Sequence, residues 1–445
     1  MRKVLILTYY WPPAGGAGVQ RWLKFVKYLR DFGWEPLVYT VENGEMPVLD
    51  ESLIKDIPKG VTVLKKPIWE PYQLYKWFIG RKKDDRINAS FLNENKKTGL
   101  AEKVSVWIRG NFFIPDARLF WIRPSKRFLS AYLQQNPVDC IISSGPPHSM
   151  HLIALGLRRR FPNLKWIADF RDPWTNIDFY DKLMLSPFAD RLHKKMERAV
   201  LREADAVLSI GKTMNEDFMA LYQASGGKDL HKFKVISNGF DSEDLPAQSP
   251  EKDQKFSLAH IGTLVKDRNP EVLWKVLRKL IGEHDDFKNK LEIKLVGKCD
   301  YAVKEQINYY GLSGYVKQVE YLPHNEVVIE QQKSRVLLLL VNQTKNAKGI
   351  LTGKFFEYMA SGSPILCIGP DDGDIADILL KTGSGLISDF SDENGLEKNL
   401  LDLFNGTVLK PDHARIDAYS RKSLTRELSE LLRQVCSAGS GAEFK

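Results

Sequence analysis

The turn that begins at Thr352 carries residue types that suit the binding of a phosphorylated ligand. Thr352, Gly353 and Lys354 offer backbone N–H groups and a cation at the point where a helix is expected to begin. Glu357 lies one turn further along, where its carboxylate can accept hydrogen bonds from a diol. Gly362 then ends the helix before an apolar strand. The segment predicts a site for a diphosphate with a ribose beside it, and the alternative is a surface helix with a polar cap.

A glycine-rich loop, residues 11–21, follows the first apolar run of the chain. Gly16 and Gly18 allow close backbone approach, and the helix expected from about residue 19 directs its N–H groups at the same space. A dinucleotide site is the alternative, because such sites also use a glycine-rich loop after a strand. The third glycine of that fingerprint is absent, and Glu42 is only a weak counterpart of its ribose-binding acid.

Two further loops in the first half of the chain carry polar side chains directly after strand-like runs. His148 follows the run 140–143, and we expect it either to hydrogen-bond a sugar hydroxyl or phosphate or to be a structural histidine. Asp169 and Asp172 follow the run 165–168. They are expected to orient an acceptor hydroxyl, or else to pair with Arg171 in a salt-bridged brace of the loop.

In the second half, Lys266 and Arg268 lie between the run 256–261 and a helix expected from about residue 270. Two cations at this place fit a clamp on phosphate oxygens, although basic residues are also common in solvated loops. Asp372-Gly373-Asp374 spells D-x-D in a turn-rich stretch. We interpret it as a solvated turn rather than a divalent-metal site, and we expect no metal to be required.

The elements that must position these residues alternate along the chain between apolar runs of strand length and amphipathic helical stretches. This rhythm is typical of a parallel α/β sheet with helices on both faces. The first series of runs is 4–7, 36–41, 62–64, 140–143, 165–168, 206–210 and 234–236. The second series is 256–261, 292–296, 316–321, 336–341 and 364–368. The polar, turn-rich segment 238–254 between them is the predicted linker.

Length and composition agree with two folded domains in the cytoplasm. A chain of 445 residues is too long for one ordinary core, and its 43% hydrophobic content can fill two. The four cysteines lie far apart, without metal-ligand spacing, and are expected to be reduced thiols; they are Cys140, Cys299, Cys367 and Cys436. We expect no secretory signal and no membrane-spanning helix. The net charge of +9 favours anionic partners, but no nucleic-acid-binding module is recognisable.

Taken together, these motifs resemble the retaining nucleotide-sugar glycosyltransferases of the GT-B fold, in particular family 4. The resemblance covers nearly the whole chain in the right order. It rests on the loop ending Gly18-Val19-Gln20, the Pro147-His148 loop, the 169–174 segment, the hinge motif 235–241, Gly262 and the 354–364 motif. It implies two Rossmann-like doubly wound domains facing across a cleft. The implied domains are an acceptor-binding domain, 1–245, a nucleotide-sugar-binding domain, 255–415, and a C-terminal helix, 416–445, that packs near or crosses to the first.

The resemblance also implies roles for individual residues. Glu357 matches the acid that holds the donor ribose, and Thr352-Gly353-Lys354 matches the backbone that meets the diphosphate. Gly16 and Gly18 match the loop beside the transferred sugar and its phosphate. His148 matches the histidine beside that sugar, and Asp172 is its companion in catalysis or positioning. Gln20 and Arg171 are the candidate acceptor-binding residues.

Two positions depart from the family pattern. The usual first glutamate of the donor motif falls on Gly349, and the arginine usual after the glycine at 262 is Thr263. We therefore expect Arg268, with Lys266 as second candidate, to neutralise the leaving diphosphate. A protein of this fold that binds nucleotide sugars without transferring them is the competing interpretation, and Gly349 is its best support.

The segment 68–123 is the least family-like and mixes aromatic residues with cations. Such a mixture is expected either to lie on an anionic membrane face or to pack as a helical excursion on the first domain. The first interpretation fits a lipid-linked or polysaccharide acceptor in cell-envelope assembly and a peripheral position on the inner face of the membrane.

Overall fold

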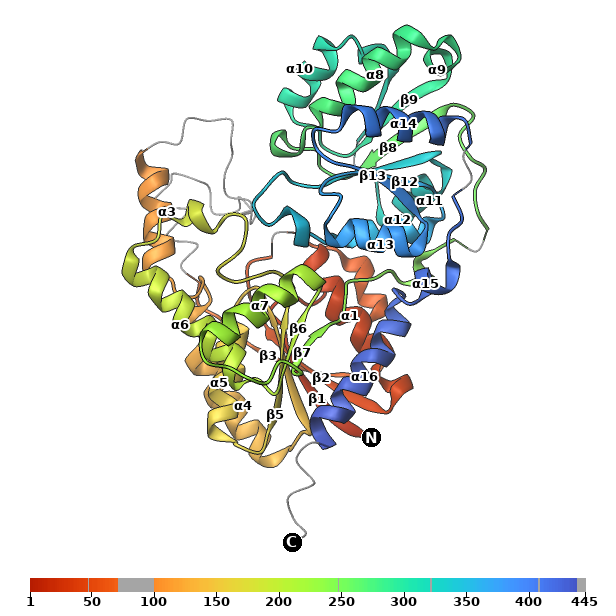
Figure 1. Ribbon diagram of the computed structural model, residues 1–445. Helices are drawn as coiled ribbons and strands as arrows, with labels where there is room; N and C mark the ends of the chain where they lie inside the picture. Colours follow the sequence, from red (N-terminus) through yellow and green to blue (C-terminus); the bar gives the residue numbers. More distant parts are fainter. Residues whose placement is uncertain (47, 71–99, 247, 321, 407–408, 438–445) are drawn as a thin grey trace. The chain divides into compact units, whose positions relative to one another are not determined.

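The computed structural model describes residues 1–46, 48–70, 100–246, 248–320, 322–406 and 409–437 (Figure 1). The chain forms two compact units. Unit 1 comprises Met1–Ser237 and Leu424–Lys445, and unit 2 comprises Asn238–Ser423. The division falls at the first residue of the predicted linker. Residues 238–245 and 416–423, which the sequence had assigned to the first domain and to the C-terminal helix, fall in unit 2.

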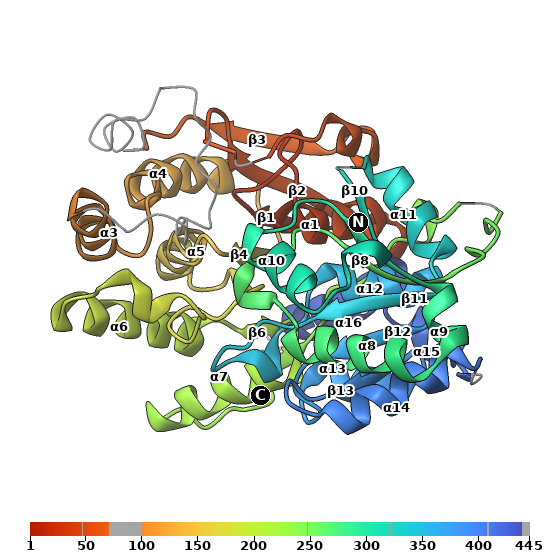
Figure 2. The ribbon, with the colours of Figure 1, turned by 90° about the horizontal axis from the view of Figure 1, so that it is seen from above.

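Unit 1 is built on a parallel sheet whose seven described strands have the order β3-β2-β1-β4-β5-β6-β7. The strands are β1 (Arg2–Leu7), β2 (Trp34–Val41), β3 (Thr62–Lys66), β4 (Cys140–Gly145), β5 (Lys165–Phe170), β6 (Ala206–Ser209) and β7 (Phe233–Val235). The helices are α1 (Ala17–Leu29), α3 (Leu100–Phe112), α4 (Leu119–Gln135), α5 (Ser149–Arg160), α6 (Pro187–Glu203), α7 (Lys212–Ala224) and α16 (Arg421–Ser437). Figures 1 and 2 show α4 and α5 on one face of this sheet and α1 and α16 on the other.

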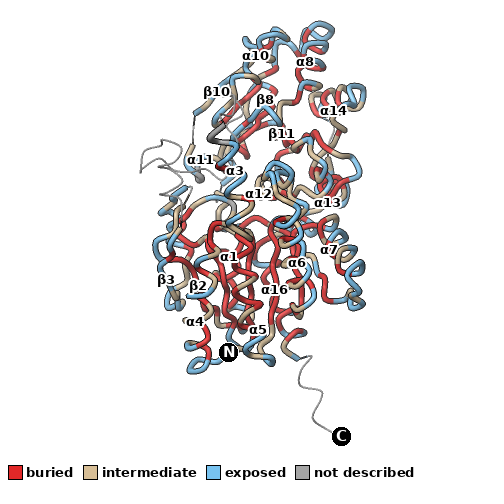
Figure 3. Tube along the Cα trace, turned by 90° about the vertical axis from the view of Figure 1, so that its left-hand side faces the viewer, coloured by how far each residue is buried: buried red, intermediate tan, exposed pale blue. Residues whose placement is uncertain are grey.

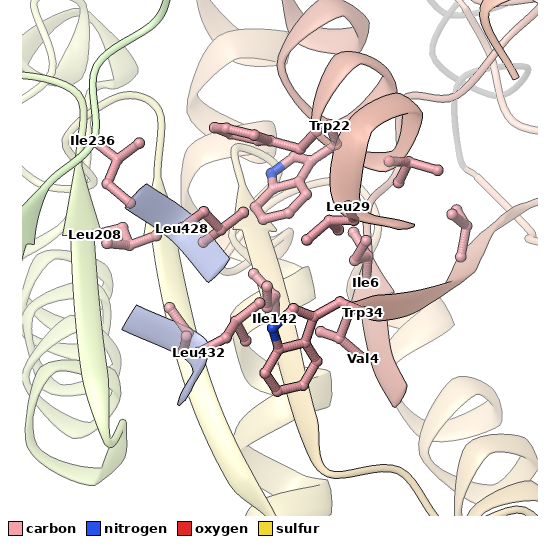
Figure 4. Close-up of a cluster of buried hydrophobic side chains, with 14 of the residues drawn as sticks. Val4, Ile6, Trp22, Leu29, Trp34, Ile142, Leu208, Ile236, Leu428 and Leu432 are labelled. Atoms are coloured by element: carbon pink, nitrogen blue, oxygen red, sulfur yellow. The ribbon is translucent and has the colours of Figure 1, made fainter. Parts of the chain in front are cut away.

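The core under α1 and α16 shows why the first helix forms where it does. Val19, Trp22, Leu23 and Val26 recur at helical spacing and are fully buried against β1 and β2. Leu428 and Leu432 of α16 complete the same cluster (Figure 4). Figure 3 shows the resulting buried stripe along both helices. The C-terminal helix is therefore part of the core of unit 1.

Unit 2 repeats the architecture with a parallel sheet of six described strands in the order β10-β9-β8-β11-β12-β13. The strands are β8 (Phe256–Ile261), β9 (Leu291–Val296), β10 (Val316–Val319), β11 (Val336–Leu340), β12 (Ile365–Ile368) and β13 (Gly385–Ser388). The helices are α8 (Glu271–Glu283), α9 (Asp285–Lys290), α10 (Tyr301–Tyr309), α11 (His324–Lys333), α12 (Gly353–Ser361), α13 (Asp374–Thr382), α14 (Glu393–Phe404) and α15 (His413–Asp417). Leucines of α8 and α14 fill the core on one face.

Helix α12 packs on the other face of this sheet. Its Tyr358 hydroxyl accepts a hydrogen bond from the backbone N–H of Ile261, at 3.0 Å, so the helix is fixed at the carboxyl end of β8. Ligands of parallel α/β sheets bind at this end. The packing therefore brings the start of α12 to the edge of the sheet where a ligand site is expected.

The α/β class with two doubly wound parallel sheets, predicted from the sequence, is confirmed. Each apolar run predicted as a strand corresponds to a strand of the structure, and β13 is the strand that the sequence analysis did not predict. No helix in the described part of the chain is long and apolar enough to cross a membrane. Residues 71–99 of the aromatic and basic segment 68–123, for which a membrane surface and a packed helical excursion were the two interpretations, lie outside the described residues.

Candidate functional site

The candidate site of unit 2 starts at the N-terminus of α12. Thr352 is the N-cap residue, in extended conformation, and its side chain makes no capping hydrogen bond. Its Oγ1 is buried and has no hydrogen-bond partner within the described residues. The first N–H groups of a helix have no acceptor inside the helix and attract anions. The turn Thr352-Gly353-Lys354 thus opens a helix, as the sequence predicted, and its contact with a diphosphate stays a prediction.

Lys354 extends from α12 towards the loop after β8. Its Nζ would lie 2.6 Å from a Cβ built on Gly262, whose φ of +122° also favours glycine. The side chain of Lys354 therefore occupies space that a larger residue at 262 would take. The glycine after β8 leaves room for a cation at the sheet edge.

Arg268 belongs to a short 3-10 helix, Lys266–Arg268, in the same loop. Its Nε donates to Oδ1 of Asn342, at 2.6 Å, just past the end of β11. This hydrogen bond ties the guanidinium to the carboxyl edges of two neighbouring strands. Lys266 and Thr263 are exposed. The structure thus holds Arg268, and not Lys266, beside Lys354.

Electrostatic effects confirm that these charges lie close together. Burial lowers the pKa of Lys354 to about 8, and the nearby charge of Arg268 lowers it as well, while Glu357 opposes the shift. Burial also lowers the pKa of His260, at the end of β8, to about 3, with further contributions from Lys354 and Arg268. Two cations and one carboxylate therefore share the edge of this sheet, and a bound anion would relieve their repulsion.

The remaining predicted positions of unit 2 lie around this group. Glu357 is half-buried on α12, one turn after Lys354. Position 349, where the family pattern has a glutamate, is a glycine at the end of the 3-10 helix Ala347–Gly349 and supplies no carboxylate. Asp372 pairs with Lys348 at 2.5 Å, and Asp374 is the first residue of α13. No group of three or more metal-binding side chains occurs among the described residues.

In unit 1, the glycine-rich loop leads into α1. Gly16 is the N-cap residue with φ +88°, and Gly18 and Gln20 lie in the first turns. Arg171 donates through Nη1 to the carbonyl of Gly18, at 2.6 Å, and through Nη2 to the carbonyl of Pro146. This buried guanidinium holds the loops after β1 and β4 together. The acceptor contacts predicted for Gln20 and Arg171 stay predictions.

Asp169 has a structural role, as a brace that does not involve Arg171. Its carboxylate is fully buried and accepts hydrogen bonds from Arg21, Trp22 and Ser144. Burial raises its pKa, but the charge and hydrogen bonds of Arg21 more than offset this, so the pKa lies below its usual value. Of the two interpretations of this carboxylate, the structure favours the salt-bridged brace, with Arg21 as its partner.

His148 lies at the start of α5 in the wall of a cavity of about 480 Å³. Its ring stacks on Trp174, with centroids 4.5 Å apart and planes 2° from parallel. Its Nδ1 is buried against Gly145 and has no partner within the described residues. Burial lowers the pKa of His148 well below its usual value, and the neighbouring His151 and His193 add to this. His148 is therefore neutral, and Asp172 lines the same cavity.

Several functional positions were missed by the sequence analysis. Asn342, the partner of Arg268, could have been found, because it follows the predicted strand 336–341 as the other candidates follow theirs. Arg21, His193 and Asp178 could not, because their place depends on tertiary packing. Arg21 lies inside α1, and the other two enter the cavity wall from α6 and from the loop after β5.

The comparisons with known proteins bear on the fold. No protein-family model matches the sequence, and no curated protein matches it. Solved structures do resemble it. The sucrose-phosphate synthase of Thermosynechococcus elongatus superposes with a TM-score of 0.61 at 15% identity, over 98% of this chain and 100% of that one. The lipopolysaccharide outer core galactosyltransferase WaaB gives 0.57 at 13% identity, over 98% and 99%.

A third structure is a variant of TarM from S. aureus in complex with Fondaparinux, alpha-GlcNAc-glycerol and UDP. It gives a TM-score of 0.59 at 12% identity, over 97% of this chain and 100% of that one. At these identities the likeness establishes the fold. The chain has the two parallel-sheet units of GT-B glycosyltransferases.

Proposed function

We propose that the protein is a glycosyltransferase that moves a sugar from a nucleoside-diphosphate sugar to a saccharide or lipid-linked acceptor. The observation that carries the proposal is the cluster at the edge of the unit 2 sheet. It joins the start of α12, Lys354, Arg268 and Glu357 at the ends of β8 and β11. The free N–H groups and cations bind the diphosphate, and the Glu357 carboxylate accepts hydrogen bonds from the ribose diol.

The main role of this cluster in the reaction is to stabilise charge. As the bond between sugar and phosphate breaks, negative charge grows on the diphosphate, and cations held in place beforehand lower the barrier. Arg268 is held by Asn342, and a guanidinium group is able to grip two phosphate oxygens at once. We propose transfer with retention at the anomeric carbon and without a metal ion. The anomeric configuration of the product, followed by NMR in the presence of EDTA, tests both points.

The test of the function is an assay with a panel of nucleotide sugars. The purified protein is expected to release nucleoside diphosphate slowly from one of them, and faster with a saccharide acceptor. Glu357→Gln should weaken binding of that nucleoside diphosphate by about 1.5–3 kcal/mol, because the diol loses charge-assisted hydrogen bonds. Glu305→Gln, on the exposed face of α10, is the matched control. Tight binding without turnover would instead indicate a binding or regulatory protein, and no binding would refute the proposal.

We further propose that unit 1 rests on an anionic membrane face through α3 and the start of α6. Phe112 and Phe188 are 65% and 71% exposed, and Trp107 is exposed beside them. The two elements are joined by Asn111, which donates to the carbonyl of Met184 and accepts from the N–H of Ser186. Exposed cations occur on the same elements or next to them: Lys103 in α3, Lys182 in the 3-10 helix Tyr180–Leu183 and Arg191 in α6. Aromatic and basic residues together suit an anionic bilayer surface.

Vesicle sedimentation tests the membrane proposal. The protein should bind vesicles that contain phosphatidylglycerol more strongly than vesicles of phosphatidylcholine alone, and salt should weaken the binding. Phe188→Ser should reduce binding, whereas Tyr309→Ser, at an 82% exposed position of unit 2, should not. Equal binding to both kinds of vesicle, or to neither, would overturn it.

A further inference from the structure

Several side chains that line the cavity beside His148 have no role in the proposed function as stated so far. The cavity lies at the carboxyl ends of β4 and β5, where the loops after both strands meet α3 and α6. Aromatic rings form much of its lining: Tyr10, Phe113, Trp174, Phe179 and Tyr180. Aromatic faces beside a few polar groups are typical of sites for small molecules, and a volume of about 480 Å³ accommodates one sugar ring with substituents.

Carboxylates outnumber cations in this wall. Glu45, Asp116, Asp172 and Asp178 line the cavity. The lining cations are Arg109 and Arg118, and Arg118 is paired with Glu70 at 3.0 Å. The histidines in the wall, His148 and His193, have lowered pKa values because of burial and add no positive charge. The described lining is therefore negative overall.

Asp172 and Asp178 are the carboxylates most available to a ligand. Both are exposed to solvent, and neither makes a hydrogen bond or a salt bridge to a described residue. Desolvation in the cavity wall raises the pKa of Asp172, the charge of the neighbouring Arg171 lowers it, and repulsion from Asp178 raises it further. Asp116 differs because it accepts hydrogen bonds from the N–H and hydroxyl of Ser149. Two neighbouring carboxylates with unused acceptors attract hydroxyl and ammonium groups and repel anions.

A second observation points to a ligand in the same cavity. The imidazole of His148 is nine-tenths buried, stacked on Trp174, and its Nδ1 is turned against Gly145 without a partner in the described chain. The ring edge that carries Nε2 is the one left for the cavity. A neutral imidazole at that place can donate to or accept from a hydroxyl group.

We propose that this cavity is the acceptor subsite and that it takes a hydroxylated sugar ring bearing an amino group in preference to one bearing a carboxylate or phosphate. Asp172 and Asp178 set this preference by pairing with the ammonium group and repelling acidic acceptors. The inference rests on the proposed function, because it names the acceptor class of that transferase. This preference is opposite to the one that the net charge of +9 of the whole chain would favour.

The test measures binding and does not depend on turnover. Methyl glucosaminide, methyl glucoside and methyl glucuronide are titrated into the full-length protein at pH 7 and followed by saturation-transfer NMR. The glucosaminide should bind about tenfold more tightly than the glucuronide, with the neutral glucoside between them. The double variant Asp172→Asn, Asp178→Asn should remove this order. Asp31→Asn, an exposed carboxylate in the 3-10 helix Arg30–Phe32 that follows α1, is the matched control and should keep it.

The outcomes separate this inference from the proposed function. Equal or tighter binding of the glucuronide, or an order that the double variant keeps, would overturn the inference even if unit 2 binds a nucleoside diphosphate. Failure of every nucleoside diphosphate to bind would overturn the proposed function, whatever the three glycosides do. Thermal unfolding of the variants shows whether a lost preference reflects the charges or a lost fold.

Discussion

At the scale of single residues, the protonation state of Lys354 is expected to control how tightly unit 2 binds the proposed diphosphate ligand. Burial lowers its pKa to about 8, so its ammonium group is protonated below that pH and lost above it. A diphosphate binds the protonated form and raises its pKa in the complex. Affinity for the nucleoside diphosphate should therefore be constant below pH 8 and fall up to about tenfold per pH unit above it.

Lys354→Met removes this pH dependence and should weaken binding at pH 7 by at least about tenfold. The lowered pKa means that the buried ammonium opposes folding at pH 7, so the variant should unfold at a temperature no lower than the parent. Calorimetric titrations between pH 6 and 9.5, with thermal unfolding of both proteins, check both statements. A variant that keeps the pH dependence would remove Lys354 from the site.

Arg268 and Lys266 lie two residues apart in one loop but differ in environment. Arg268 is fixed by Asn342, whereas Lys266 is exposed. Arg268→Ala should depress turnover by about 10²–10³ and donor affinity much less, because the diphosphate charge is largest in the transition state. Lys266→Ala should change both constants little. Steady-state kinetics of the two variants decide, and a reversed pattern would assign the clamp to Lys266.

The sequence predicted these residues because of a single physical rule. Side chains that follow parallel strands gather at one edge of the sheet, so Arg268 and His148 could be nominated from the strand pattern, whereas Lys354 was nominated from the helix start at Thr352. The same rule also predicts Asn342. It does not predict His193, which lines the cavity from within α6, and it does not show that Asp169 is buried beneath α1.

At the scale of elements, α1 is fixed to unit 1 by a buried ion pair. Arg21 donates to Asp169 of β5 and to the carbonyls of Ile236 and Ser237, where the chain leaves β7. The inner strands of this sheet could be predicted from apolar runs, since they are largely buried on both faces, whereas the edge strands β3 and β7 are partly exposed. The exception is β13 in unit 2, which is short, begins at Gly385 and is only half-buried, so it lacks the apolar signal.

Breaking this ion pair should destabilise unit 1 strongly. Arg21→Met leaves the Asp169 carboxylate buried without its cation, at a cost of about 3–5 kcal/mol in unfolding free energy. Asp169→Asn should also destabilise unit 1, because the buried Arg21 guanidinium then lacks its counter-ion. Urea unfolding followed by tryptophan fluorescence measures both, with Arg202→Met, an exposed arginine of α6, as the control. A loss for Arg21→Met no larger than that of the control would show that the pair is dispensable.

At the scale of the whole molecule, the last helix belongs to the first unit. The chain leaves unit 1 after Ser237 and returns to it at Leu424. The resemblance predicted that the C-terminal helix, 416–445, packs near or crosses to the first domain, whereas the apolar spacing of a helix does not by itself show which core it joins. The packing of Leu428 and Leu432 against β4 and β6 shows it (Figure 4).

This return predicts that a change near the C-terminus weakens the N-terminal sheet. Leu428 is fully buried, so Leu428→Ala should lower the stability of unit 1 by about 2–5 kcal/mol through the lost contacts and the cavity left behind. Hydrogen exchange should then rise in peptides of β1 and β4 and remain unchanged in β8 and β11, whose core contains no residue of α16. Leu380→Ala, at an 86% exposed position of α13, is the matched control. Increased exchange in β8 and β11 with β1 and β4 unaffected would place the stabilising contacts of α16 in the other unit.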